Sequence, residues 1–550
     1  MMSTPTHPKG ARARVLLTSV FGPYAHDDAY GSRSINPMEL YHNQVTREQG
    51  PFSLRLFHRS WGILFIQANI SAPCTVLDFP TRERFRKELE AHRYDVVGIS
   101  SIVMNVGKVK EMCRLVREVS PHSTIVVGGH VASIPELPAL IDADHIVRGE
   151  GIAWMRRFLG EDDSRPIIHP PIESGFGHRV MGLKLPFKMG STTATIVPSV
   201  GCPMGCNFCA TSAFFGGKGK IVNFIESGRE LFRVMEESER ALRLESFFMM
   251  DENFLLYRKR AMELLDCMKQ AGKAWNLYVF SSANAIRKYT MEELTELGVS
   301  WVWMGLESPR AGYAKLQGSD AVSLTRELRS HGIRVLGSTI IGMEHHTLDN
   351  IQAEIDHAAD CGTDFHQFML YTPLPGTELN EQMKREGRLL DVDLADIHGQ
   401  YKFNWKHPHI SRDDSKRFLD FAFLRDFEIN GPSLARIAAT TLEGWKRYRF
   451  YPDLRVRERF EREAAALKTY YSGVLWAMEK HLADTNAAVA ARMSALRDEI
   501  RRECGVSSAW IARMIGPLLL WTTRREQKRL ARGVTYEPKT FVNRTNWQEA

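Results

Sequence analysis

Cysteine is scarce in this chain, which holds only eight in 550 residues. So few cysteines cannot form the disulfide framework of a secreted scaffold, and no apolar segment with a cleavage site follows Met1, so we expect a protein of the reducing cytoplasm. The chain also lacks an apolar run of the ~20 residues that a membrane-spanning helix needs. Its 44% hydrophobic and 25% charged residues are ordinary values for a globular protein and exclude a disordered or collagen-like chain. The cysteines therefore belong either to a hydrophobic core or to chemistry.

A strong overall charge is absent too, because 72 Lys and Arg against 65 Asp and Glu leave a formal net charge of +7. The excess is local: residues 441–550 alone hold 21 Lys and Arg and 13 Asp and Glu. Positive charge attracts an anionic partner when it is concentrated in one region. If the protein has such a partner, we expect it at the C-terminal end.

Short apolar runs alternate with helical stretches over residues 14–163, as in a parallel sheet with crossover helices. This pattern predicts a doubly wound, Rossmann-like α/β domain, followed by a Pro- and Gly-rich linker over residues 164–190. The expected strands cover residues 15–20, 74–79, 96–100, 124–127 and 145–147, and the clearest helices cover residues 81–92 and 106–119.

A second series of strands and helices predicts a partial (β/α)6 barrel over residues 191–410, and catalytic groups in barrels lie at the C-terminal ends of the strands. The strand signal ends near Ser411, so we expect residues 411–550 to form a mostly helical, basic domain. The six barrel strands are expected at residues 193–198, 246–250, 277–282, 300–305, 335–341 and 366–370.

Three of the eight cysteines, Cys202, Cys206 and Cys209, follow the first of these six strands within a single short loop. Thiolates at this spacing can converge on one metal centre. Structural zinc needs four protein ligands, and no fourth Cys or His lies nearby in the sequence, although one could come from elsewhere in the fold. Three thiolates on a four-iron cluster leave one iron open to a small molecule. Three buried structural thiols are the remaining interpretation.

The loop resembles the signature of radical S-adenosylmethionine (SAM) enzymes, in its cysteine spacing and in the aromatic Phe208 before the third cysteine. The resemblance implies a [4Fe-4S] cluster on Cys202, Cys206 and Cys209, whose open iron binds the amino and carboxyl groups of SAM. It also implies SAM-contacting positions at the strand ends: Asp251, Glu252 and Asn253 after the second strand, Ser282 after the third, Glu307 and Ser308 after the fourth, and Ile340 and Gly342 at the fifth. Asp251 and Glu252 have an alternative interpretation as solvated or capping carboxylates.

The N-terminal α/β domain resembles the cobalamin-binding domain that precedes the barrel in B12-dependent radical SAM enzymes. The resemblance rests on Gly128, Gly129 and His130 and on residues 148–151, which include Glu150. Ser100 and Ser101 would lie beside them at the carboxyl ends of the strands, where doubly wound sheets bind ligands. The Asp-x-His-x-x-Gly motif that supplies an axial histidine in other cobalamin proteins is absent, so the resemblance implies cobalt without a protein histidine. His130 is the one candidate exception, and a sheet without any ligand is the alternative.

The resemblance as a whole implies a cobalamin-dependent radical SAM enzyme that methylates an unactivated carbon. In such enzymes a 5′-deoxyadenosyl radical abstracts hydrogen from the substrate, which then takes a methyl group from methylcobalamin. An external electron donor and a small-molecule substrate are implied as well. Residues 371–387 and the basic tail are most similar to branches that act on lipid or isoprenoid substrates, including hopanoid methylases.

Other functions share some of these features. A radical SAM and B12 enzyme that forms rings, couples carbons or rearranges its substrate without methyl transfer would carry the same motifs. A tRNA methylthiotransferase would need a second cluster in the N-terminal domain, where Cys74 and Cys113 are too few. A binding module stabilised by metal would hold zinc and no iron.

Within the basic tail, residues 509–521 are apolar except for Arg513 and have a Trp near each end. A basic cluster follows immediately, at Arg524, Arg525, Lys528, Arg529 and Arg532. This pattern suits a helix that lies in an anionic membrane interface, so we expect peripheral membrane contact through this region. The alternative is a core helix with a solvated basic face. We expect no nucleic acid, because the interleaved aromatic and glycine pattern of RNA-binding modules is missing.

Overall fold

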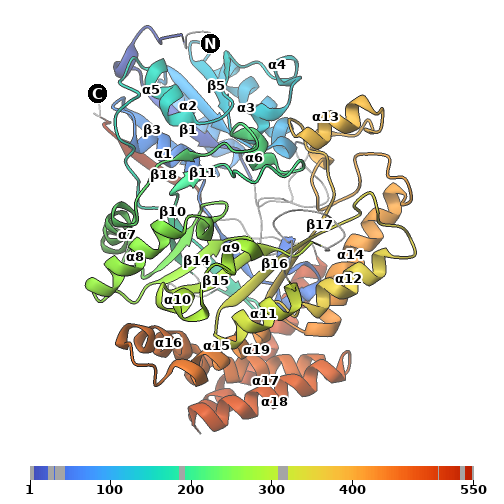
Figure 1. Ribbon diagram of the computed structural model, residues 1–550. Coiled ribbons are helices and arrows are strands. Elements are labelled where there is room, and N and C mark those ends of the chain that lie inside the picture. Colours follow the sequence, from blue (N-terminus) through green and yellow to red (C-terminus); the bar gives the residue numbers. More distant parts are fainter. Residues whose placement is uncertain are drawn as a thin grey trace.

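The computed structural model describes residues 5–22, 30, 44–184, 192–307, 320–505, 507–532 and 539–547. Ser308 and the last part of the predicted linker, residues 185–190, lie outside these ranges. The N-terminal sheet, the barrel-like sheet and the C-terminal helices form three successive tiers (Figure 1). Both chain ends lie at the tier of the N-terminal sheet (Figure 1).

The N-terminal tier is a parallel sheet with the strand order β3-β1-β4-β5-β6, extended at the β3 edge by a strand from the C-terminus. Apolar residues pack on both faces of this sheet in two buried clusters, which explains why its strands read as continuous hydrophobic runs. The prediction of a doubly wound domain is confirmed. Its strands are β1 (Val15–Ser19), β3 (Cys74–Asp78), β4 (Val96–Ser100), β5 (Thr124–Gly128) and β6 (His145–Ile146), and its helices are α1 (Trp61–Ala68), α2 (Arg82–Ala91), α3 (Val106–Val119), α4 (Leu137–Leu140) and α5 (Gly151–Phe158).

The C-terminal strand β18 (Phe541–Thr545) pairs antiparallel with β3, at the edge of the N-terminal sheet. The expectation of a mostly helical tail did not include this strand. Its Arg544 forms a 2.6 Å ion pair with Glu88 of α2, whose side chain is 1% exposed. The strand covers the β3 edge, which would otherwise present unpaired backbone groups.

The middle tier is an open sheet whose six parallel strands follow the chain order, β10-β13-β14-β15-β16-β17. The sheet does not close, because β10 pairs on its outer side with the short antiparallel β7 (Glu173–Ser174) and not with β17. The prediction of a partial barrel is confirmed. Its strands are β10 (Thr193–Ile196), β13 (Ser246–Met249), β14 (Asn276–Phe280), β15 (Val299–Gly305), β16 (Arg334–Ile341) and β17 (Phe365–Leu370), and its outer helices are α7 (Gly228–Leu242), α8 (Arg258–Gln270), α10 (Met291–Glu296), α11 (Ala321–Ser330) and α12 (Ile351–Asp360).

The segment expected to be a linker carries regular structure in its described part. Besides β7, it contains β8 (Phe176–Val180) and β9 (Leu183–Lys184), and β8 pairs with β2 (Arg55–Phe57). The segment between the N-terminal tier and the barrel is therefore held by strand pairing, through β8 to β2 and through β7 to the barrel strand β10.

The lowest tier is helical, as expected, and most of its buried apolar residues form one cluster with Leu336 and Phe365 from the barrel strands. Beside this cluster, Arg334 of β16 forms a 2.7 Å ion pair with Glu463. The tier thereby covers the N-terminal ends of the barrel strands and leaves their C-terminal rim facing the N-terminal sheet. No described helix is both long and apolar enough to cross a membrane. Its helices are α15 (Ser433–Tyr448), α16 (Leu454–Ala466), α17 (Ser472–Leu482), α18 (Ala487–Cys504) and α19 (Ser507–Ala531). Helix α14 (Arg412–Asn430) lies instead beside the barrel sheet (Figure 1), where its Phe423 belongs to one buried cluster with Ile355 of α12 and Phe368 of β17.

Candidate active site

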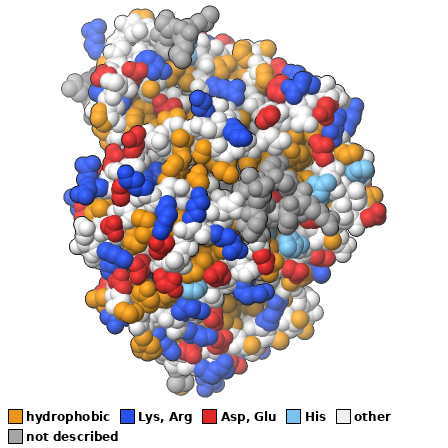
Figure 2. Space-filling model, in the orientation of Figure 1, with side chains coloured by type: hydrophobic (Ala, Val, Ile, Leu, Met, Phe, Trp, Pro, Cys, Tyr) orange, Lys and Arg blue, Asp and Glu red, His pale blue; other side chains and the backbone are white. Residues whose placement is uncertain are grey.

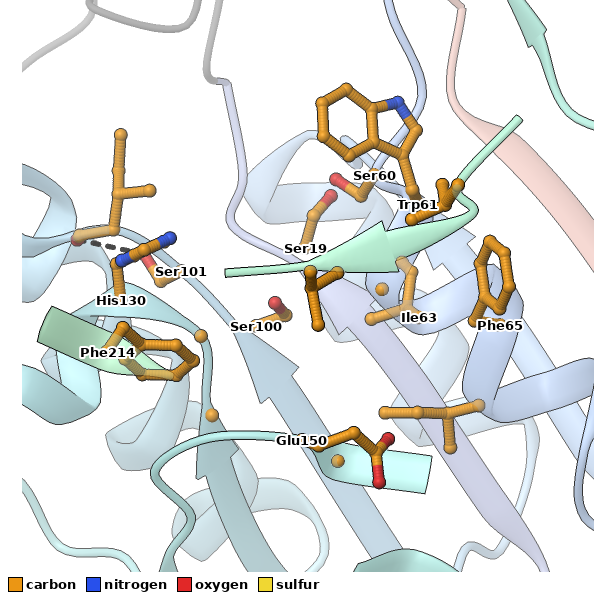
Figure 3. A pocket seen from close by; sticks show the side chains of 18 of the residues that line it. Ser19, Ser60, Trp61, Ile63, Phe65, Ser100, Ser101, His130, Glu150 and Phe214 are labelled. Atoms are coloured by element: carbon orange, nitrogen blue, oxygen red, sulfur yellow. Dashed lines mark hydrogen bonds between the residues drawn. The ribbon is translucent and has the colours of Figure 1, made fainter. Parts of the chain in front are cut away.

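A cavity of about 610 Å³ lies between the carboxyl edge of the N-terminal sheet and the C-terminal rim of the barrel. Both tiers line it, and Figure 3 shows the part formed by the N-terminal sheet and α1. Seven of the predicted site residues are among its walls: Ser100, Ser101, Gly128, Gly129, His130, Glu150 and Glu252.

The cavity includes the point where the strand order of the N-terminal sheet reverses, between β1 and β4. Ser19 and Ser100, the last residues of these strands, are direct neighbours in the sheet, and both line the cavity (Figure 3). Ligands of doubly wound sheets bind at this switch point. Ser100 was predicted from its place at the end of a strand, and Ser19, which was not predicted, has the same place at the end of the first strand.

Gly129 follows β5 with a φ of +81°, a conformation that favours glycine. A Cβ atom there would lie 2.5 Å from the backbone oxygen of Ser101. The turn after β5 can therefore lie against the end of β4 only if residue 129 has no side chain.

Gly129→Ala is expected to lower cobalamin affinity at least about tenfold and to destabilise the protein by about 2 kcal/mol, because it adds a clash to backbone strain. Gly160→Ala is the matched control, since Gly160 also has a positive φ (+65°) but meets only an ordinary 3.5 Å contact outside the cavity. Spectrophotometric cobalamin titration and thermal unfolding measure the two effects. Equal cobalamin affinities for the two variants would contradict the assignment.

Three buried polar atoms in the cavity wall have no hydrogen-bond partner among the described residues: Nδ1 of His130, Nδ2 of Asn105 and Nε1 of Trp61. Leaving such groups unpaired is costly, so their placement indicates a ligand with hydrogen-bonding groups. Cobalamin, with its peripheral amides and its phosphate, fits this wall. Burial lowers the pKa of His130 to about 4, so its imidazole is neutral near pH 7, and its ring packs 4.6 Å from that of Phe214.

Glu150, which also lines this wall, stabilises the start of a helix. Its carboxylate accepts hydrogen bonds from the backbone N–H groups of Ile152 and Ala153, so it caps the N-terminus of α5. A role for Glu150 in binding cobalamin stays a prediction.

The three-cysteine loop runs from the barrel to the short helix α6 (Ala210–Phe214). Gly205 allows its tight turn, because φ is +64° and a Cβ would lie 2.5 Å from the Cβ of Lys218. Burial, and to a lesser degree the neighbouring Cys209, Glu252 and Cys206, raise the pKa of Cys202 to about 11. A metal centre would therefore displace protons from these thiols when it binds.

The number of thiolates in the loop suits a cluster better than a structural zinc ion. Structural zinc takes four protein ligands, whereas the loop offers three thiolates, one for each of three irons of a four-iron cluster. Among the described residues, the group whose three potential ligand atoms lie within 4.8 Å of one another is His345, His346 and Glu354, and the three cysteines do not meet this criterion.

The segment after β17 holds this loop in place. The backbone oxygen of Asn207 accepts a 3.0 Å hydrogen bond from the N–H of Leu379, and the amide of Asn207 donates to the hydroxyl of Tyr371 over 3.3 Å. Phe208 packs edge-on against the ring of Tyr371, with 6.1 Å between the ring centroids. Phe208 is thus part of the packing that orients the loop, and it is not among the cavity walls.

The three predicted residues after β13 have different surroundings. Asp251 forms a buried ion pair with Arg260, and Asn253 donates a 3.2 Å hydrogen bond to the hydroxyl of Ser282, joining the ends of β13 and β14. Glu252 alone lines the cavity, close enough to Cys202 to affect its pKa. Burial, with a smaller effect from Asp251, raises the pKa of Glu252 to about 7. Direct SAM contacts from Asp251, Asn253 and Ser282 stay predictions.

Three more predicted residues lie at the ends of β15 and β16, outside the cavity walls. Glu307 is buried at the C-terminal end of β15. Gly342 has a φ of +72° and contacts the ring of Phe403, which leaves no room for a side chain. Ile340 packs against the buried cluster that includes Phe403. Their roles in SAM binding also stay predictions.

An aromatic wall that the sequence analysis did not single out lies on the barrel side of the cavity. Phe248, Phe280 and Trp303 come from neighbouring strands, with 5.6 and 4.7 Å between successive ring centroids, and all three line the cavity. Strand alternation could have identified them, since every second residue of a barrel strand points inward. The wall offers apolar surface to a bound carbon skeleton.

Comparison with known protein families identifies the same two units. The family described as the Radical SAM superfamily matches residues 196–358, and the B12 binding domain matches residues 61–158. Fold and site therefore define a radical SAM enzyme with a cobalamin-binding domain, and these domains imply a [4Fe-4S] cluster, SAM and cobalamin as cofactors. The chain therefore combines the two domains, radical SAM and B12-binding, that characterise cobalamin-dependent radical SAM enzymes.

Several relatives are named as methyltransferases or methylases. The chain is 29% identical to the bacteriochlorophyllide d C-12(1)-methyltransferase of Chlorobaculum tepidum, over 60% of this chain and 74% of that protein. It is 23% identical to the hopanoid C-2 methylase of Rhodopseudomonas palustris, over 63% and 67% of the two chains. The solved structure of the radical SAM methyltransferase TsrM from Kitasatospora setae covers 82% of this chain and 99% of its own, with a TM-score of 0.50 and 14% identity. At that identity the likeness shows a shared fold.

Proposed function

We propose that this protein is a cobalamin-dependent radical SAM methyltransferase that methylates an unactivated carbon. One observation carries the proposal: a single cavity joins the switch point of the cobalamin-binding sheet to Glu252, which neighbours the three-cysteine loop. A methyl donor and a hydrogen-abstracting centre must both reach the same carbon, which requires such a shared space. The methyltransferase names of the relatives support this function.

The cavity walls and the three-cysteine loop, whose cysteines are not among these walls, would have different roles. Cys202, Cys206 and Cys209 would hold the cluster, and the ends of β4 and β5 would hold cobalamin. When bound, the cluster would supply the electron that cleaves SAM, and cobalamin would carry the methyl group. Glu252, near the cluster loop, would accept a hydrogen bond from the amino group of SAM. The aromatic wall would hold the substrate carbon and exclude water from a reactive radical.

We propose a small molecule or lipid as the substrate, because the aromatic wall suits an apolar skeleton. An external carrier would deliver the electron to the cluster. The protein would act in the cytoplasm, with peripheral membrane contact through its basic C-terminal region and without nucleic acid.

Anaerobic reconstitution tests the enzyme class without knowledge of the substrate. We expect iron and sulfide for one four-iron cluster per chain, one bound cobalamin, and release of 5′-deoxyadenosine from SAM under reducing conditions. A colourless protein with one zinc would overturn the proposal.

Methyl transfer is tested with cell extract as the source of substrate. Methylation should produce S-adenosylhomocysteine together with 5′-deoxyadenosine and a product heavier by one methylene unit. Production of 5′-deoxyadenosine without S-adenosylhomocysteine would favour ring formation, coupling or rearrangement. Comparison of lipids and metabolites from cells with and without the protein would identify the product.

A further inference from the structure

Helix α19 exposes four large apolar side chains: Trp510 (66% exposed), Met514 (78%), Leu518 (54%) and Trp521 (57%). At about 100° per residue they lie within a sector of about 80°, in a stripe roughly 16 Å long. The described residues include nine exposed large hydrophobic side chains in all, so this one helix holds nearly half of them. We call these four residues the apolar stripe.

The opposite side of α19 is packed firmly on α17. A Cβ at Gly516 would lie 2.6 Å from the ring of Trp476, and a Cβ at Gly473 would lie 2.5 Å from Ile515. Ala512 and Leu519 are buried on the same side. The helix is therefore held in one orientation, and exposure of the apolar stripe follows from close packing behind it.

Positive charge continues the line of the apolar stripe toward the C-terminus. On the same helical geometry, Arg525 and Lys528 fall within the sector of the stripe and Arg524 lies within about 40° of it. These three side chains are exposed and form no ion pair with any carboxylate of the described residues. The guanidinium of Arg525 lies 5.7 Å from the ring centroid of Trp521. The surface thus combines an apolar half with a cationic half.

We propose that this face of α19 docks onto an anionic lipid bilayer, with the helix axis parallel to the membrane surface. Trp side chains prefer the boundary between headgroups and acyl chains, and Arg and Lys beside them bind anionic headgroups. A second copy of the chain is a poorer occupant. Antiparallel pairing of two stripes, with Trp510 opposite Trp521, would place Arg524 of each helix level with the positively polarised N-terminal end of the other. The inference deepens the peripheral membrane contact of the proposed function by naming the surface that makes it, and it does not depend on methyl transfer.

Flotation of the full-length protein with vesicles tests the proposal. We expect binding to phosphatidylcholine vesicles that contain phosphatidylglycerol, and much weaker binding to phosphatidylcholine alone or at high salt. Arg524→Gln, Arg525→Gln and Lys528→Gln together should reduce binding to the anionic vesicles on the order of 100-fold. Trp510→Ser with Trp521→Ser should reduce it at least about tenfold.

Point substitutions are preferable to removal of α19, which would leave α17 without its packing partner. Ile168→Ser is the matched control, because Ile168 is 62% exposed but lies outside the helical tier. This variant should bind anionic vesicles as strongly as the unmodified protein does. Unchanged thermal unfolding and unchanged SAM cleavage in solution would show that the variants fold and that the proposed function is unaffected.

Two results would overturn the proposal. One is equal binding of the unmodified protein and of both α19 variants to anionic vesicles. The other is a dimer in solution, without vesicles, that the two Trp substitutions dissociate, because the apolar stripe would then belong to a second copy of the chain.

Discussion

Replacing Cys202 by alanine is expected to stop the release of 5′-deoxyadenosine from SAM while cobalamin binding persists. The loop offers three thiolates, and a four-iron cluster that loses one of them has two incompletely ligated irons in place of one. The loss of activity should exceed by far the 10- to 100-fold typical for an outer-shell partner of a metal site. Cobalamin is proposed to bind at the ends of β4 and β5, in a different tier, so its affinity should be unchanged.

Cys267→Ala provides the matched control for this experiment. Cys267 is half-buried on α8, outside the cluster loop, so the variant should keep both the iron content and the SAM cleavage of the unmodified protein. Iron and sulfide analysis, product chromatography and cobalamin titration measure the three quantities. Production of 5′-deoxyadenosine by the Cys202 variant at the normal rate would refute the cluster assignment.

Acidification is expected to unfold the protein between about pH 6 and pH 5. Six histidines are buried deeply enough that burial lowers the pKa of each to about 4, against 6.5 in an unfolded chain. Between about pH 6.5 and pH 4 the unfolded chain binds protons at these histidines that the folded chain does not bind. The free energy of unfolding therefore falls as the pH falls through this range. The six residues are His58, His130, His169, His178, His366 and His398.

The size of this effect follows from proton linkage. Each buried neutral histidine costs about 1.4 kcal/mol per pH unit below 6.5, so six together cost about 8 kcal/mol per unit, against a typical stability of 5 to 15 kcal/mol. Thermal unfolding of the cofactor-free protein, followed by circular dichroism from pH 8 to pH 4.5, measures it. His366→Gln should reduce the slope, whereas His122→Gln, at an exposed loop position, should not. The same unfolding temperature at pH 7 and pH 5 would contradict the prediction.

Most of the fold could be predicted because its signals are local. Five apolar runs in the first tier and six in the second correspond to strands, since a parallel strand covered on both faces must be apolar along its length. Strand β18 gave no comparable signal. Its five residues are half-exposed or exposed, and they form a strand because the edge of β3, more than 460 residues away in the chain, accepts their backbone hydrogen bonds.

The sequence identified some parts of the candidate site better than others. The cysteine loop and the ends of β4 and β5 were found by motif and by topology. Asp251, Glu252 and Asn253 were all predicted to contact SAM. Asp251 pairs with Arg260 and Asn253 bonds to Ser282, and of the three residues Glu252 is the one that lines the cavity. Which side chain of such a group is free to face a ligand depends on partners that come from other elements.

The sequence by itself determined the class of this protein, because the thiol spacing and the order of strands and helices lie within continuous segments of the chain. Only the tertiary structure decided that one cavity connects the two ligand-binding tiers. It also decided that the last strand returns to the first sheet and that the apolar stripe of α19 is exposed. These features depend on contacts between residues far apart in the chain. The side of an amphipathic helix that is buried is set by its neighbour, here α17, and the helix's own residues do not specify that neighbour.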